Sequence, residues 1–321
     1  RSCACSRTGD SGRRDCLDPD RFPLRAATLR PLLTMPVDLK LLAGVSRSFY
    51  ISLRFVPRAM RDPLGAAYLL ARLTDTIADS GALSPKQRLA GLDLLREVIV
   101  EDKPEHDAVL WCNTQAISQT APGERDLLQK AAAVIESFQS QQATDREDIR
   151  KVLEIILTGQ RSDLIRFENE PRSVTCLTEE ELDRYTYQVA GCVGEFWTAL
   201  GFRHVHPFSR SGFPQMREWG IAFGKGLQLV NILRDLPEDL RHGRCYLPIP
   251  EPGKILESVT HSAVPPEVIP WFSRTEEGLR AGLRYADENC SFRLRFCCGV
   301  PAMLGIETLK RVRTNFGKPG I

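Results

Sequence analysis

Apolar residues recur at spacings of three and four along most of the chain, which is the repeat of a helix that buries one face. This pattern predicts helices over about residues 59–79, 86–101, 105–119, 124–140, 144–168, 178–200, 211–236, 266–287 and 290–315. Prolines and glycines mark the breaks between these segments, as at Pro104 and Pro171. Alternation typical of strands is almost absent. The pattern therefore predicts an all-α fold, a helical bundle formed by a single domain.

Two stretches lie outside this pattern. Residues 1–34 show no sustained periodicity and carry seven arginines and four aspartates, whereas the sequence becomes helical directly after Met35. We expect Met35 to be the natural start, residues 1–34 to be upstream translation or a disordered arm, and residues 35–321 to form the domain. Six prolines between residues 247 and 270 predict an irregular loop on the surface.

The composition narrows the class of protein. Lys and Arg total 43 against 41 Asp and Glu, a net charge of +2, so the chain lacks the basic excess typical of nucleic-acid-binding proteins. No apolar run approaches the ~20 residues of a membrane-spanning helix, and residues 1–34 lack the apolar core of a signal peptide. The ten cysteines are scattered through a chain large enough to form a core. We therefore expect reduced, mostly buried thiols and a cytoplasmic protein.

Two pairs of aspartates carry the candidate chemistry. Asp75 and Asp79, and likewise Asp235 and Asp239, are four residues apart, so each pair would lie on one face of its helix. Like charges at this spacing are destabilising unless a cation neutralises them. Mg²⁺ prefers oxygen ligands and commonly joins one or two carboxylates to substrate phosphates. No His or Cys accompanies either pair, which disfavours zinc. Two facing pairs would hold a metal-diphosphate cluster.

Acidic pairs are also common on solvated helix faces, so their context matters. Asp75 follows a mostly apolar helical segment, which predicts that its face is buried. A polar stripe begins at Gln228 and includes the second aspartate pair, and such a stripe inside an apolar helix costs free energy unless it binds something. Pro237 interrupts that pair. We expect the helix to kink or end near Asp235, with Asp239 in the following turn, which makes Asp235 the safer ligand.

Longer motifs surround these residues in a fixed order. They are Ser46-Arg-Ser-Phe-Tyr50, the segment from Tyr68 to Asp79, Tyr185-Thr-Tyr-Gln-Val-Ala-Gly-Cys-Val-Gly194, Gly224-Lys-Gly-Leu-Gln-Leu-Val-Asn-Ile-Leu-Arg-Asp235 and Arg244-Cys-Tyr-Leu-Pro248. In these motifs the chain resembles the squalene/phytoene synthase family, and within it the bacterial squalene synthases (farnesyl-diphosphate farnesyltransferases). The resemblance extends from Val37 to about Phe316.

The resemblance implies the fold of the head-to-head prenyl synthases, with a central cavity. Two molecules of farnesyl diphosphate would lie in this cavity, with Mg²⁺ between their diphosphates and the acidic motifs. Their condensation gives presqualene diphosphate, and in squalene synthases a reduction by NADPH then gives squalene. The oily product implies transient contact of a cytoplasmic enzyme with the membrane surface, and no nucleic-acid partner is expected.

The resemblance also assigns roles to individual residues. The Mg²⁺ ligands would be Asp75, Asp79, Asp235 and Asp239, and Tyr185 would take part in removing the proton of the first step. Polar residues expected in the substrate site are Ser46, Arg47, Ser48, Tyr68, Arg72, Gln228, Asn231 and Arg234. By residue type, Ser46 and Ser48 could equally cap a helix. Residues expected to line the prenyl channel are Phe49, Val189, Ala190, Val193 and Gly194. By residue type alone, the small side chains of 189–194 fit either close helix packing or a chain-like ligand.

Several alternatives stay open. A phytoene, dehydrosqualene or presqualene-diphosphate synthase would share the first step and end differently. The chain stops at Ile321 with no match to the short basic segment that is linked to reduction in squalene synthases. We expect a fragment or a mis-called reading frame, and a product short of squalene stays an alternative. A non-enzymatic relative acting as an assembly factor would be expected to lose the acidic ligands that this chain keeps. A cyclising terpene synthase fits poorly, because its second motif normally mixes Asn, Ser or Thr and Glu.

Overall fold

The computed structural model describes residues 38–46, 49–168, 175–259 and 264–316. All of these residues belong to one compact unit, Leu33–Ile321. The predictions made for residues 1–34, for a start at Met35, and for Arg47 and Ser48 lie outside the described residues, as does the side chain of Phe49.

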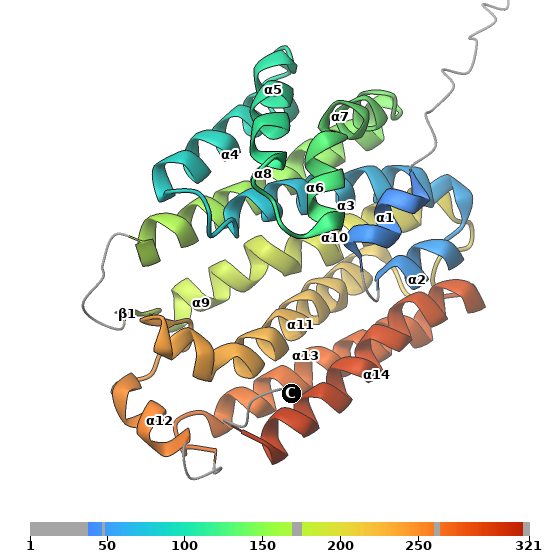
Figure 1. The fold of residues 1–321 in the computed structure, drawn as a ribbon. Helices are drawn as coiled ribbons and strands as arrows, with labels where there is room; N and C mark the ends of the chain where they lie inside the picture. Colours follow the sequence, from blue (N-terminus) through green and yellow to red (C-terminus); the bar gives the residue numbers. More distant parts are fainter. Residues whose placement is uncertain (1–37, 47–48, 169–174, 260–263, 317–321) are drawn as a thin grey trace, which may run out of the picture. The chain divides into compact units, whose positions relative to one another are not determined.

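Helices make up most of the described chain and are joined by short connections (Figure 1). In chain order the elements are α1 (Leu39–Val45), α2 (Phe49–Phe55), α3 (Arg58–Ala78), α4 (Pro85–Ile99), α5 (His106–Ala116), α6 (Pro122–Gln129), α7 (Ala131–Gln139), α8 (Ala143–Glu168), β1 (Thr175–Cys176), α9 (Glu179–Thr186), the π-helical turn η1 (Tyr187–Gly191), α10 (Cys192–His204), α11 (Phe213–Arg241), β2 (Arg244–Cys245), α12 (Pro252–Val259), α13 (Ile269–Glu288) and α14 (Phe292–Thr314). The two short strands pair in parallel.

The prediction of an all-α fold is confirmed, and two of the predicted helices are divided. Segment 124–140 forms α6 and α7, which meet at Lys130. Segment 178–200 forms α9 and α10, which are joined by the π-helical turn. Turns of this kind are frequent at functional sites. This one places its side chains at the cavity described below.

Two predictions based on proline are wrong. α11 continues through Pro237 to Arg241, so Asp239 lies within the helix and not in a following turn. Proline removes a single backbone donor, and Pro237 is buried, as are Leu236 and Leu240 of the same helix. The segment 247–270 is not a surface loop throughout, because it contains α12 and the start of α13. Leu247 and Ile249, which alternate with its prolines, are buried in the core.

Small residues let α11 pack closely against α10 and α13, its neighbours on either side (Figure 1). A Cβ atom added to Gly194 of α10 would lie 2.0 Å from the carbonyl oxygen of Gly220 in α11. A Cβ atom on Gly226 of α11 would lie 2.8 Å from the carbonyl carbon of Gly278 in α13. Both separations are shorter than a real Cβ contact. The two helix pairs could not approach this closely with any larger residue at these positions.

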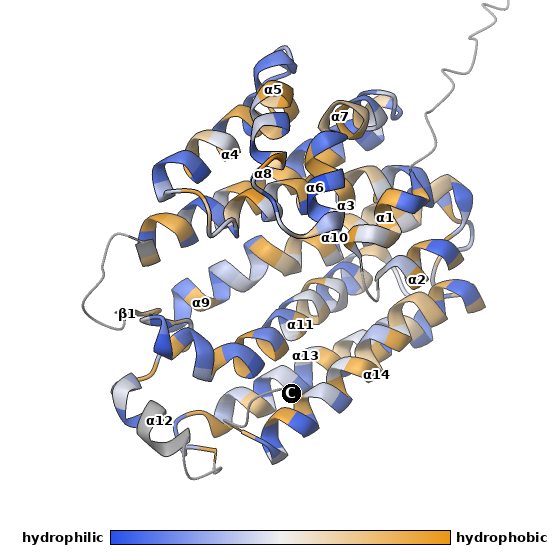
Figure 2. Ribbon diagram, viewed as in Figure 1, coloured by the Kyte–Doolittle hydropathy of each residue, from blue (hydrophilic) through white to orange (hydrophobic). Residues whose placement is uncertain are grey.

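Apolar residues are buried in two groups. The larger lies among α3, α4, α7, α8 and α10 and includes Leu70, Phe138 and Leu153. The second surrounds α11, α12 and α13 and includes Leu233 and Phe272. Figure 2 shows hydrophobic and hydrophilic residues alternating along single helices such as α4 and α5, as expected for helices that bury one face.

The seven cysteines in the described ranges are free thiols, and five of them are buried, in agreement with the prediction from their spacing. Within the same ranges, no helix has both the length and the apolar character needed to span a membrane.

Candidate active site

A large cavity lies between α3, α8, α9, α10 and α11. Its volume is about 1420 Å³, which exceeds the ~300–1,000 Å³ of ordinary small-molecule pockets. Tyr285 of α13 and Cys297, Cys298 and Pro301 of α14 complete its wall. A space of this size can hold a ligand larger than a usual metabolite.

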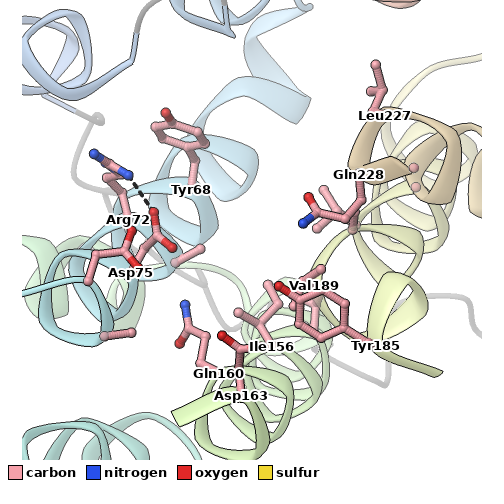
Figure 3. Close-up of a pocket in the computed structure, with 18 of the residues that line it drawn as sticks. Tyr68, Arg72, Asp75, Ile156, Gln160, Asp163, Tyr185, Val189, Leu227 and Gln228 are labelled. Atoms are coloured by element: carbon pink, nitrogen blue, oxygen red, sulfur yellow. Dashed lines mark hydrogen bonds and ion pairs between the residues drawn. The ribbon is translucent and has the colours of Figure 1, made fainter. Parts of the chain in front are cut away.

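The lining changes from apolar to polar along the cavity. On α3 the lining residues begin with Leu64 and end with Asp79, and on α8 they run from Val152 through Gln160 and Asp163 to Phe167. Tyr185 of α9 lies near Asp163 (Figure 3), and the apolar lining of η1 and α10 continues from there to Trp197. The cavity therefore has a polar end and an apolar end, a division that suits a ligand with a charged head and a hydrocarbon chain.

The predicted residues of α3 converge at the polar end. Tyr68, Arg72, Asp75 and Asp79 follow one another at spacings of four, three and four, and all line the cavity. Arg72 forms an ion pair with Asp75 (Figure 3). It donates a second hydrogen bond to Glu124, at 2.7 Å between Nη2 and Oε1. The Nε atom of Arg72 is buried without a hydrogen-bond partner among the described residues. One guanidinium donor is thus left for another acceptor.

Asp79 ends this stripe where α3 stops. The restricted hydration of its carboxylate at the cavity wall and the like charge of Asp75 raise the pKa of Asp79 to about 6. Arg72 and Arg244 act in the opposite direction without cancelling the shift. The polar end is therefore short of positive charge.

The polar side chains of α8 at this end were missed by the sequence predictions. Gln160 and Asp163 are three residues apart and face the cavity (Figure 3). Burial raises the pKa of Asp163 to about 6, and Asp239 and Asp79 add to the shift. The Oε1 atom of Gln160 is buried and has no hydrogen-bond partner in the described chain. A Gln-x-x-Asp spacing within the apolar segment 144–168 was the signal available for finding this pair.

Tyr185 stands in a small aromatic network beside Asp163. Its ring is stacked on that of Tyr246, with the ring centroids 5.0 Å apart and the planes inclined by 24°. Tyr246 donates a hydrogen bond from its hydroxyl to Oδ2 of Asp163, at 3.0 Å. Burial and the charge of Asp163 raise the pKa of Tyr185 well above its usual value, although a hydrogen bond with Tyr246 opposes the shift. Its phenol is neutral at physiological pH.

The second acidic motif is arranged differently from the first. Gln228 lines the cavity, but Asn231, Arg234 and the two aspartates are not among the lining residues. Asp235 is held by its neighbour Arg234 through two hydrogen bonds of 2.7 Å. Asp239 lies near enough to the polar end to raise the pKa of both Asp163 and Tyr185. Burial raises the pKa of Asp239 itself to about 6.

Arg244 is a second residue that carried no predicted role. It lines the polar end and lowers the pKa of both Asp163 and Asp239 by its positive charge. Gly243 precedes it with φ of +77°, a conformation that glycine adopts without strain. This turn ends α11 and directs the chain into β2. Arg244 lies within a motif quoted above, but the sequence alone did not predict that its charge would act on these acids.

The small residues predicted to line the channel do so. Val189, Ala190, Val193 and Gly194 all line the cavity, and Gly194 also makes the close contact with α11 described above. These small residues therefore serve both purposes that their size allowed, lining the cavity and permitting close helix packing. Ser46 is buried and lies next to the phenol of Tyr68, outside the cavity lining.

The chemistry of the polar end fits a hard divalent cation shared with a ligand. No three His, Cys, Asp or Glu side chains within the described ranges form a ready-made metal site. Mg²⁺ does not require one, because it commonly uses one or two carboxylates together with water and phosphate oxygens. The available donors are oxygen atoms, including the unpartnered Oε1 of Gln160. The positive charge of Arg72 and Arg244 compensates only in part for the three carboxylates with raised pKa values.

Comparison with known proteins decides the family. The squalene/phytoene synthase model matches residues 42–317. This chain belongs to the squalene/phytoene synthase family. It is a family of prenyltransferases that join prenyl groups head to head, and the resemblance drawn from the motifs is confirmed at this level.

Individual relatives agree with this assignment. A 15-cis-phytoene synthase of Synechocystis sp. is 30% identical over 213 residues, 64% of this chain and 53% of the relative. A presqualene diphosphate synthase of Rhodopseudomonas palustris is 29% identical over 228 residues, 70% of this chain and 65% of the relative. The matches thus span between about half and two thirds of the length of these relatives.

Solved structures share the fold. A squalene synthase from Alicyclobacillus acidocaldarius superposes with a TM-score of 0.56 and 20% identity, covering 88% of this chain and 97% of the other. A dehydrosqualene synthase with bound ligand gives a TM-score of 0.55 and 19% identity, covering 87% and 86%. At this level of identity the similarity establishes the architecture of the helices.

Proposed function

We propose that this protein condenses two molecules of farnesyl diphosphate head to head, in a Mg²⁺-dependent reaction, to give presqualene diphosphate. With NADPH, the same cavity would convert this intermediate to squalene. The observation that carries the proposal is the division of one large cavity into an acidic end and an apolar body. A diphosphate with its metal ions requires the former, and two prenyl chains require the latter.

The residues of the polar end would act on the leaving diphosphate. Asp75 and Asp79, together with Asp163 or Asp239, would hold Mg²⁺, which would neutralise the diphosphate as its bond to carbon breaks. Arg72 and Arg244 would add fixed positive charge at the same end. The buried Nε of Arg72 offers a donor that no described protein group uses.

The apolar body would protect the allylic cation. Its wall is formed by side chains such as Val189, Phe196 and Trp197, which provide no nucleophile and exclude water. Capture of the cation by water is therefore disfavoured. The double bond of the second substrate, held in the same space, becomes the nearest electron pair.

Tyr185 would assist the proton loss that closes the cyclopropane ring. Its phenol is neutral, so it would accept a proton only while passing its own to a hydrogen-bonded group. The stacked Tyr246 provides that group, and its hydroxyl is bonded to the Asp163 carboxylate at 3.0 Å. Asp163, with a pKa of about 6, is a base suited to neutral pH.

A second candidate is a phytoene or dehydrosqualene synthase. Several relatives are named phytoene synthases, including those of Synechocystis sp. and Arthrospira platensis. These reactions would use the same acidic end and differ in the length of the prenyl chain or in the fate of the intermediate.

Product analysis tests these proposals. The full chain is incubated with farnesyl diphosphate or geranylgeranyl diphosphate and Mg²⁺, with and without NADPH, and the products are identified by mass spectrometry. We expect presqualene diphosphate without NADPH and squalene with it. Phytoene from the longer substrate, or dehydrosqualene, would favour the second candidate.

Asp79→Asn should abolish turnover, whereas Asp287→Asn, at an exposed acid of α13, should not. Absence of any condensation product from correctly folded protein would refute the enzymatic role.

A further inference from the structure

Exposed apolar side chains gather on one surface formed by α2 and the first half of α14, the α2–α14 face. Its members are the exposed residues Ile51, Phe55, Phe292, Met303 and Leu304 and the partly buried Phe296. The exposed fractions are 50% for Ile51, 47% for Phe55, 80% for Phe292, 57% for Met303 and 52% for Leu304. Aliphatic and aromatic groups exposed together to this extent mark an interaction surface more often than single exposed residues do.

The two helices lie side by side (Figure 1). The rings of Phe55 and Phe296 are in contact, with centroids 4.9 Å apart. On α14, Phe292, Phe296 and Met303 are separated by four and seven residues, so they share one side of the helix. Ile51 and Phe55 are likewise four residues apart on α2. The α2–α14 face is therefore continuous across the helix pair.

Positive charge predominates on the two segments that form this face, with Asp62, Glu288 and Glu307 just outside them. Residues 49–60 and 290–306 contain Arg54, Arg58, Arg293 and Arg295 and no Asp or Glu, a local charge of +4 in a chain whose total is +2. Within the described part of the chain, no salt bridge joins any of these four guanidinium groups to a carboxylate. A partner with negative charge next to an apolar phase would complement such a surface.

The opposite side of α14 lines the cavity. Cys297, Cys298 and Pro301 form part of the cavity wall. A single helix thus separates the apolar body of the cavity from the exposed apolar face.

We propose that the α2–α14 face docks onto a lipid bilayer that contains anionic headgroups. Phenylalanine and aliphatic side chains enter the boundary between headgroups and acyl chains, and the arginines bind the lipid phosphates. A bilayer supplies both components that this face would match, an apolar phase and a layer of negative charge. The binding would occur whether or not the cavity performs the condensation proposed above.

The test is flotation of the full chain with vesicles of phosphatidylcholine, with and without phosphatidylglycerol. Wild-type protein should float with the anionic vesicles, and added salt should weaken this binding. The double variant Ile51→Ser/Phe292→Ser should bind at least about tenfold more weakly, and Arg54→Gln or Arg293→Gln about fivefold more weakly each. All four positions are exposed or on the rim, and circular dichroism and thermal unfolding verify that each variant folds.

A matched control removes equal apolar character elsewhere. Leu110 and Ile117, in and next to α5, are 58% and 85% exposed, and Leu110→Ser/Ile117→Ser should leave vesicle binding unchanged. Equal loss in this control, or no binding to either vesicle, would overturn the proposal. Two other occupants are also distinguished. A dimer in light scattering that Phe292→Ser dissociates would assign the face to a second copy. Vesicle binding that appears only after residues 1–34 are removed would assign it to that segment.

Discussion

The strongest test of the acidic end is the effect of Asp163→Asn on the stability of the ligand-free protein. The folded protein holds this carboxyl at a pKa of about 6, whereas an exposed aspartate titrates near ~3.9. The folded state therefore binds more protons than the unfolded state between these values. Stability attributable to this group falls as the pH rises from about 4 to about 6, and the penalty is complete above that range.

The size of the effect follows from the shift. Two pKa units correspond to about 3 kcal/mol, which is an upper bound because water in the cavity screens the charge. We expect about 1–2 kcal/mol at pH 7.5. The asparagine keeps an acceptor for the hydroxyl of Tyr246, so the hydrogen bond at this position is retained. Asp163→Asn should therefore make the protein more stable at pH 7.5 and equally stable at pH 4.

Urea unfolding in EDTA at the two pH values measures this difference. Asp287→Asn removes the same charge from an exposed side chain and serves as the control. Product formation is measured in parallel, and we expect Asp163→Asn to lose at least about tenfold in turnover because the final proton acceptor is gone. If Asp163→Asn is less stable than wild type at pH 7.5, or gains the same stability at pH 4, the ionised Asp163 carboxylate does not destabilise the folded protein and the reasoning is refuted.

Two further predictions concern the close contact between α10 and α11 and the binding of Mg²⁺. Gly194→Ala should destabilise the fold by about 1–3 kcal/mol in urea unfolding, because its Cβ would meet the Gly220 carbonyl oxygen at 2.0 Å. A Cβ atom on Gly253 would have open space around it, so Gly253→Ala should leave the free energy of unfolding nearly unchanged. An equal loss of stability in both variants would contradict the role of the close helix contact. Mg²⁺ and inorganic diphosphate together should raise the melting temperature by a few degrees more than either alone. Asp79→Asn should remove at least half of that rise in melting temperature. An unchanged rise would show that the Mg²⁺ ligands lie elsewhere.

The sequence was sufficient for the features that depend on neighbours along one helix. The stripe from Tyr68 to Asp79 needs only the helical repeat, and the structure places all four of its polar residues at the cavity. The small-residue segment from Val189 to Gly194 was likewise recognisable from side-chain size. These positions could be predicted because spacing along a helix determines which way a side chain points.

The features that were missed depend on contacts between distant segments. Asp163 and Tyr246 are 83 residues apart, and their hydrogen bond exists because α8 and the residue that follows β2 meet at the polar end. Pro237 misled the prediction for a related reason. Proline disfavours an isolated helix, but the buried residues around it keep α11 intact to Arg241. Contacts between distant segments decided both features, and in the second they outweighed the local preference of proline.

The unbalanced charge at the polar end argues against a purely structural role for this chain. Asp79, Asp163 and Asp239 each have a pKa of about 6, so each is ionised at neutral pH at a cost to folding. A protein that kept the fold only as an assembly factor would gain stability by replacing any of them with a neutral residue. Arg72 and Arg244 reduce the repulsion but do not remove it. Three acids held in this state are explained if a cation and a diphosphate complete the charge balance during turnover.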